Sequence, residues 1–137
     1  MADLKQFEFY VLRYVPYVAR EEFINIGVLL FELLDTGFGF ADVRMTSDWR
    51  RVYRLDRQVD IEVLQELGAY IRMQLQHSQD IAVLLRKFED LFANMIQMSA
   101  RKVCLAADPA QEMARLSSIY LEDPPTEVIA RRCPPKE

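Results

Sequence analysis

Residues 7–34 read FEFYVLRYVPYVAREEFINIGVLLFELL, and this stretch decides the fold. Two runs rich in aromatic and β-branched residues, 7–15 and 23–34, are separated by residues 16–22, which read PYVAREE. Runs of this kind are typical of β-strands, and a connection of this length suits a hairpin loop. The stretch therefore predicts an antiparallel hairpin that carries a charged residue, Arg13, inside its first strand.

The rest of the chain continues the sheet and adds helices. The turn sequence DTG at 35–37 precedes an alternating run at 38–44, which predicts a third strand. Two short apolar segments, 95–99 and 103–105, predict one or two further strands. Capping residues precede apolar positions at helical spacing in several places, so helices are expected at 49–55, after Asp60, after Asp80, and from Asp108-Pro109 to about Leu121.

These elements predict an α+β fold, an antiparallel β-meander of three strands plus one or two short C-terminal strands, packed with three to four helices. The 137 residues fit a single domain. We assign this domain to residues 1–121. Residues 122–137 hold four of the six prolines, and we expect them to form a C-terminal tail.

Composition narrows the class of protein. The chain has no run of the roughly 20 apolar residues that a membrane span needs, so no membrane partner is expected. Its first residues, MADLKQFEF, lack the pattern of a secretory signal, which predicts a cytoplasmic location with Cys104 and Cys133 as free thiols. The net charge of −4 disfavours nonspecific nucleic-acid binding, although a local basic face would leave such binding open.

Strand register predicts which residues of the hairpin are neighbours, because side chains alternate between the two faces of a strand. In the simplest register Arg13 lies directly opposite Asn25, and Val11 lies opposite Gly27. The second strand would then have one wholly apolar core face, made of Ile24, Ile26, Val28 and Leu30.

The opposite face is predicted to gather polar groups beside a glycine gap, where a ligand or another backbone can approach the sheet closely. Arg44 of the third strand and the hairpin loop would lie near the same end of this face. The candidate binding residues are Arg13, Arg20, Glu22, Asn25, Gly27 and Arg44. The alternative is a satisfied polar network that fixes the hairpin register, with Gly27 marking a β-bulge, and polar networks in sheets more often specify structure than chemistry.

Familiar catalytic and metal-binding patterns are absent from the sequence. The single histidine, His77, has no second histidine at helical spacing, and no phosphate loop or dinucleotide fingerprint occurs. We therefore assign no catalytic residue, no metal ligand and no cofactor. The sequence leaves open whether the protein is an enzyme, and the absence of catalytic motifs favours a protein without enzymatic activity. The arginine-rich segment 44–57, with Trp49 and Tyr53, fits either a charged helix with an aromatic inner stripe or a stacking surface for single-stranded nucleic acid.

The run YVLRYVPYVAREEFINIGVLLF resembles the opening signature of the bacterial domain-of-unknown-function family 3037. The segments DWRRVYRLD, NMIQMS and DPAQEMARLSSIYL are also similar to that family, so the likeness covers nearly everything except the tail. The residues that match the signature are Tyr10, Arg13, Tyr14, Pro16, Arg20, Glu22, Asn25, Gly27, Val28 and Phe31.

The resemblance implies a small bacterial protein and no particular reaction. Members of the family are often encoded beside a kinase similar to the HipA toxins, which suggests a HipA-like kinase as a partner by association alone. Our first hypothesis is accordingly a protein-interaction or accessory module. The alternative is an anion-, nucleotide- or nucleic-acid-binding enzyme or accessory that uses the polar hairpin face. A homodimer that covers an open apolar face of the sheet is compatible with both.

Overall fold

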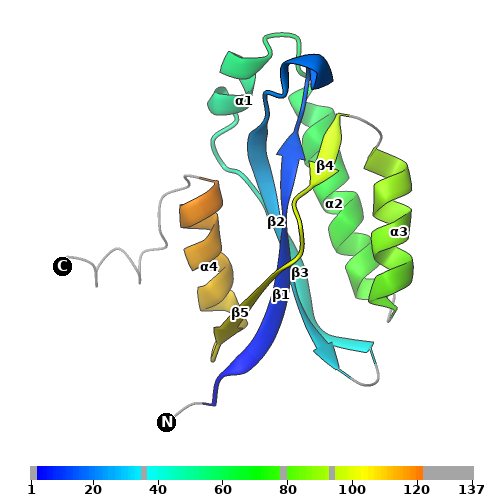
Figure 1. Ribbon diagram of the computed structural model, residues 1–137, viewed down its shortest axis with the longest axis vertical. Coiled ribbons are helices and arrows are strands. Elements are labelled where there is room, and N and C mark those ends of the chain that lie inside the picture. The colour runs from blue at the N-terminus through cyan, green and yellow to red at the C-terminus, as the bar shows by residue number, and fades with distance from the viewer. Residues whose placement is uncertain (1–2, 35–36, 78–79, 93–94, 122–137) are drawn as a thin grey trace, which may run out of the picture.

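The computed structural model describes residues 3–34, 37–77, 80–92 and 95–121 and shows a five-stranded antiparallel sheet with helices on both faces (Figure 1). The strands are β1 (Lys5–Tyr14), β2 (Ile24–Leu34), β3 (Gly37–Met45), β4 (Ile96–Met98) and β5 (Lys102–Ala106). The helices are α1 (Arg50–Leu55), α2 (Ile61–His77), α3 (Ile81–Phe92) and α4 (Pro109–Tyr120), and a 3₁₀ turn, η1 (Val18–Arg20), lies in the hairpin loop. The predicted α+β fold is confirmed, with both short C-terminal strands present.

The sheet is built around β1. Its strand order is β3-β2-β1-β4, and β5 pairs with the first half of β1 on the side where β4 pairs with its end. The first three strands form the predicted meander. The expected turn between the second and third strands falls on residues 35–36, outside the described part of the chain, while Leu34 pairs with Gly37 on either side of it.

Helices cover both faces of the sheet (Figure 1). Helices α2 and α3 lie on one side, over a core that contains Leu12, Ile26 and Phe31. Helix α4 lies on the other side, over a second core that contains Phe7 and Leu30. Because apolar side chains are buried on both sides, the sheet forms the middle layer of a three-layer domain.

The hairpin register contains a β-bulge. Arg13 pairs with Asn25, as predicted, but the next pair along β1 joins Leu12 to Gly27. Ile26 is therefore an extra residue on β2 with no counterpart on β1, and it contacts β3 instead through a bond from the Thr46 N–H to the Ile26 carbonyl.

The bulge overturns two of the register predictions. Val11 pairs with Val28 and not with Gly27. The four residues expected on one apolar face divide between the two cores, because the extra residue reverses the facing of everything beyond it. Ile24 and Ile26 pack on the α2 side, whereas Val28 and Leu30 pack on the α4 side.

Helix starts follow the predicted capping residues. Asp60 and Asp80 accept bonds from backbone N–H groups in the first turns of α2 and α3. Asp108 accepts from the Ala110 N–H, with Pro109 in the first helical turn. These local signals explain why the helix starts could be read from the sequence.

Apolar residues on both faces of the hairpin strands need covering by a helix, the tail or a second subunit, and this need was one motive for an interaction module or a homodimer. Phe7, Phe9, Leu29 and Phe31 are all buried, the first two under α4 and the others under α2 and α3. The structure therefore removes this motive for an interaction module and for a dimer alike, and the oligomeric state stays a prediction.

A buried hydrogen bond ties α1 to the sheet and yields a stability prediction. The Tyr14 hydroxyl donates to Asp56 Oδ2 at 2.7 Å, and burial together with this carboxylate raises the pKa of Tyr14. Hydrogen bonds to charged groups contribute about 1.5–3 kcal/mol. Tyr14→Phe should lower the free energy of unfolding in urea by about that amount.

The matched control is Tyr53→Phe, since the Tyr53 side chain is 51 % exposed and lies in α1 itself. A substitution there should change the free energy of unfolding by less than about 0.5 kcal/mol. Equal effects of the two substitutions would contradict a specific role for the Tyr14–Asp56 bond.

Candidate functional site

The site begins with the pair Arg13 and Asn25, which the register predicted. The two residues lie directly opposite each other on β1 and β2. Their side chains face the α4 side of the sheet, where Asn25 Nδ2 donates to the Tyr120 carbonyl at 3.0 Å. The hairpin end and the C-terminal end of α4 are thus joined at this point.

Polar atoms of this pair are buried without partners. Arg13 Nε and Asn25 Oδ1 are both inaccessible to solvent and make no hydrogen bond. The Arg13 guanidinium lies over the Phe23 ring, 4.5 Å from its centroid. Ser117, one turn before the end of α4, also has a buried hydroxyl without a partner. Buried polar groups normally have partners, so these atoms mark unused bonding capacity.

Arg51 of α1 also contacts this pair. It was not among the candidate residues predicted from the sequence. Its Nη2 donates to the Asn25 carbonyl at 3.1 Å and to Thr46 Oγ1 at 3.4 Å, while its Nε is buried without a partner. The sequence marked the whole segment 44–57 as arginine-rich. Helix α1 has 6 residues, too short for periodicity to show which arginine faces inward.

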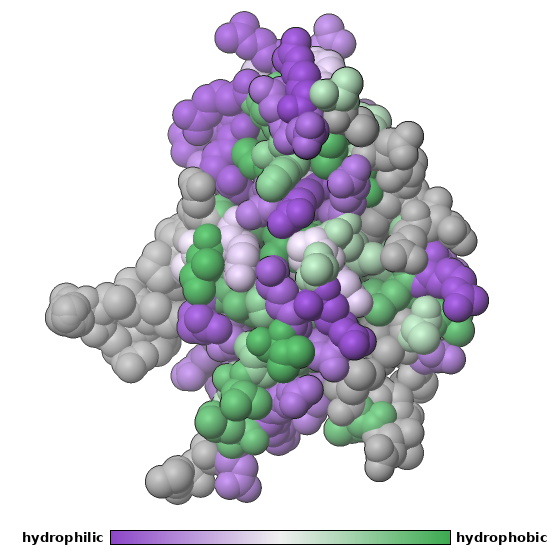
Figure 2. All heavy atoms as spheres, in the orientation of Figure 1, coloured by the Kyte–Doolittle hydropathy of each residue, from purple (hydrophilic) through white to green (hydrophobic). Residues whose placement is uncertain are grey.

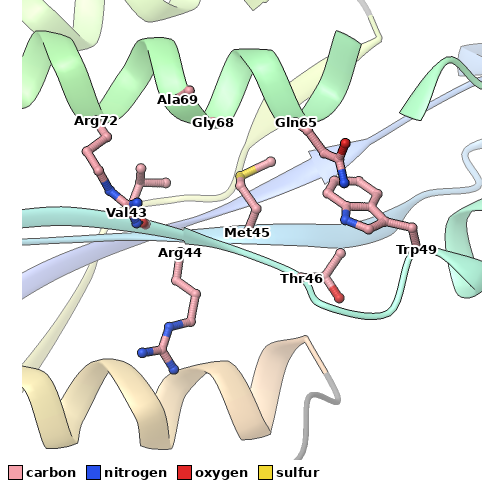
Figure 3. Close-up of a pocket in the computed structure, with 9 residues that line it drawn as sticks. All are labelled: Val43, Arg44, Met45, Thr46, Trp49, Gln65, Gly68, Ala69 and Arg72. Carbon is pink, nitrogen blue, oxygen red and sulfur yellow. The ribbon is translucent and has the colours of Figure 1, made fainter. Parts of the chain in front are cut away.

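Arg44 lies on the same side of the sheet. It pairs with Val28 of β2, and Figure 3 shows its guanidinium pointing toward α4 while Met45 and Arg72 lie on the α2 side. Within the described residues, Arg13, Arg44 and Arg51 form no ion pair with a carboxylate. We call these three residues together with Asn25 the arginine pole.

Gly27 does not belong to the arginine pole. A Cβ atom on Gly27 would lie 2.8 Å from Met45 Sδ and 3.2 Å from Leu12 Cδ1, and both of those side chains pack on the α2 side. The predicted glycine gap beside Arg13 is therefore wrong, because the bulge at Ile26 turns Gly27 to the other face. Gly27 instead makes room for core packing, as the alternative interpretation held.

Arg20 and Glu22 lie in the hairpin loop at the rim of the site. They form an ion pair at 3.7 Å with side chains 67 % and 48 % exposed, which contributes little to stability. Arg20 also lies over the Tyr17 ring, 4.9 Å from its centroid. Figure 2 shows hydrophilic side chains gathered at this end of the molecule, where the hairpin loop and α1 of Figure 1 lie.

A groove lies on the α2 side of the sheet. It has a volume of about 420 Å³ and lies between the edge of β3 and helix α2 (Figure 3). Met45, Thr46 and Trp49 line it from the sheet and the loop that follows. Arg44 of the arginine pole also lines it. Gln65, Gly68 and Arg72 line it from the helix. No sequence pattern predicted this groove.

The thiol of Cys104 is unsuited to nucleophilic chemistry. Burial, followed by the hydrogen bond with Glu112, raises the pKa of Cys104 to about 12, so the thiol stays protonated at neutral pH. Arg115 in turn holds the pKa of Glu112 below its usual value.

In the part of the chain described here, no three His, Cys, Asp or Glu side chains lie close enough to hold a metal ion. None of the described helices is both long and apolar enough to cross a membrane.

The fold and site define a small α+β domain with an antiparallel sheet between helices and a cluster of arginines at one end. Residues 9–121 match the family described as "Protein of unknown function (DUF3037)". The chain belongs to this family, since the match covers most of its length. Neither the curated proteins nor the solved structures contain a significant match to the chain.

Proposed function

We propose that this domain is an accessory, protein-interaction module that recognises an anionic group of its partner at the arginine pole. The observation that supports this most strongly is the set of partly buried arginines that form no ion pair within the described residues. Two buried carboxylates of the described residues do have ion pairs, Glu8 with Arg101 and Glu112 with Arg115. The buried Asp56 has none and accepts hydrogen bonds from the Tyr14 hydroxyl and the Gln58 N–H instead.

Unpaired charges are costly in a partly buried position. Taking a charged group out of water is unfavourable unless a counter-charge and hydrogen bonds replace the lost hydration. The carbonyl end of α4 supplies part of this compensation, because a helix C-terminus carries roughly half a negative charge. A carboxylate or phosphate would supply the remainder and accept paired bonds from a guanidinium.

The surface around the arginine pole suits a protein partner. Tyr17 and Phe23 are 45 % and 46 % exposed, and each lies beneath an arginine. Aromatic residues and arginine are enriched at the centres of protein interfaces. The exposed rings would supply apolar contact beside the charged group.

The anion-binding step is tested by thermal unfolding with phosphate, nucleotides, oligonucleotides and an acidic peptide. An anion at about ten times its Kd stabilises the folded state by about 1.4 kcal/mol, which should raise the Tm by about 3–6 °C. Arg13→Gln should abolish that rise because it removes the guanidinium opposite Asn25.

The control is Arg57→Gln, which removes an exposed arginine just beyond α1. This variant should keep the full rise in Tm. If no anion stabilises the protein, or if both variants lose the rise equally, the arginine pole is not an anion site. A rise with oligonucleotides or nucleotides alone would replace the acidic protein partner by a nucleic-acid or nucleotide ligand.

The partner itself is a separate prediction. The family resemblance suggests a HipA-like kinase by association, so this kinase is the first partner to test. The two purified proteins should elute together in size-exclusion chromatography, and Arg13→Gln should weaken their affinity by more than about tenfold. Separate elution at micromolar concentrations, with both proteins folded, would count against the kinase while leaving the anion site standing.

A further inference from the structure

Strand β5 forms an edge of the sheet, since in the described part of the chain it pairs with β1 alone (Figure 1). The opposite edge, β3, is protected by side chains. The Val43 N–H donates to Asp42 Oδ1 at 2.8 Å, and Arg72 of α2 donates both to the Val43 carbonyl and to Asp42 Oδ1. Caps of this kind hinder the addition of another strand.

The backbone of β5 is oriented by its pairing with β1. The Val11 carbonyl of β1 accepts a bond at 2.9 Å from the connection between β4 and β5, so the backbone groups of Val11 point to that side. These groups alternate along an antiparallel strand, and Phe7 therefore bonds with Cys104, its partner in the register. The N–H and carbonyl groups of Val103 and Leu105 point the other way, out of the sheet. No side chain of the described residues caps them.

The same two residues expose apolar side chains. Cys104 packs against the core under α4, so Val103 and Leu105 face the other side of the sheet, where they are 59 % and 61 % exposed. Figure 2 shows hydrophobic side chains along β5, in the orientation of Figure 1. An edge that offers free backbone groups and apolar side chains together is a template for pairing with another strand.

We propose that β5 pairs with β5 of a second copy of this chain, antiparallel and about a two-fold axis at Cys104. In this register Val103 of each copy lies opposite the partner's Leu105, and their outward backbone groups bond in both directions. Each exposed apolar side chain then covers that of its counterpart. A register shifted either way would place Leu105 opposite Arg101 or Val103 opposite Ala107 and lose one of these apolar pairs.

The charges along β5 favour pairing with itself. Arg101 and Lys102 lie at its start, and Asp108, which caps α4 through Oδ1, follows its end with an exposed carboxylate. In the proposed register Lys102 lies opposite the partner's Ala106, and a long side chain reaches diagonal neighbours such as the partner's Asp108. The two-fold axis keeps the basic starts of the two strands apart and brings each beside an acidic residue.

The interface is small, because β5 has 5 residues and a standard interface involves about 20–30 residues a side. We therefore expect a weak dimer that forms at high protein concentration. The contact lies along the first half of β1, whereas Arg13 lies near its end. The dimer is accordingly independent of the anion proposed for the arginine pole.

Hydrogen exchange of the unchanged chain tests the proposal, measured by nuclear magnetic resonance at about 50 µM and about 1 mM. The outward amides of Val103 and Leu105 should exchange about fivefold more slowly at the higher concentration, where most chains are paired. The Cys104 amide points to β1 and should exchange at the same rate at both concentrations. Sedimentation should show the dimer over the same range.

Val103→Lys should leave the chain monomeric, because a lysine on an edge strand opposes the addition of a second strand. The matched control is Val63→Lys in α2, where the valine is 54 % exposed, and it should dimerise as the unchanged chain does. Both variants should keep the Tm, since both positions are exposed.

Three results would overturn the proposal. The chain could stay monomeric at about 1 mM, or it could dimerise without slower exchange at Val103 and Leu105. The Val103→Lys variant could also dimerise as strongly as the Val63→Lys control. In each of these cases β5 is not the surface between two copies.

Discussion

The structure depends on one extra residue in β2. Ile26 has no partner on β1, so the pairing of Arg13 with Asn25 and of Leu12 with Gly27 coexists in one hairpin. Without the bulge, the alternation of side chains would send Asn25 and Leu29 to the same face. With it, the end of β2 presents a polar residue to α4 while the rest of the strand keeps apolar residues on both sides.

This constraint shapes both of the surfaces described above, the arginine pole and the groove beside β3. On the α4 side it puts Asn25 between Arg13 and Arg51, with buried polar atoms that have no partner. On the α2 side it turns Gly27 toward the side chain of Met45, which lines the groove. The cost of burying unpaired polar groups is tolerated because large apolar cores lie directly beside them.

The strands and helices could largely be predicted from local sequence patterns. Which face of the sheet each side chain of β2 occupies could not. Turn residues, capping aspartates and apolar spacing act over a few positions, so the strands and helices could be read from the sequence. The facing of Val28 could not, because helices cover both sides of the sheet and apolar residues on either parity are equally suitable. Arg51 and the Asp42–Arg72 cap depend on where α1 and α2 pack against β3, and no short-range pattern records that.

The most direct test of this account is the pattern of backbone nuclear Overhauser effects across the β1–β2 hairpin. The bulged register predicts close contacts between the backbones of Arg13 and Asn25 and, in the same molecule, between those of Leu12 and Gly27. A regular ladder would instead bring Val11 opposite Gly27 while keeping Arg13 opposite Asn25. Observing that second pattern would contradict the assignment of faces on which the arginine pole and the groove both rest.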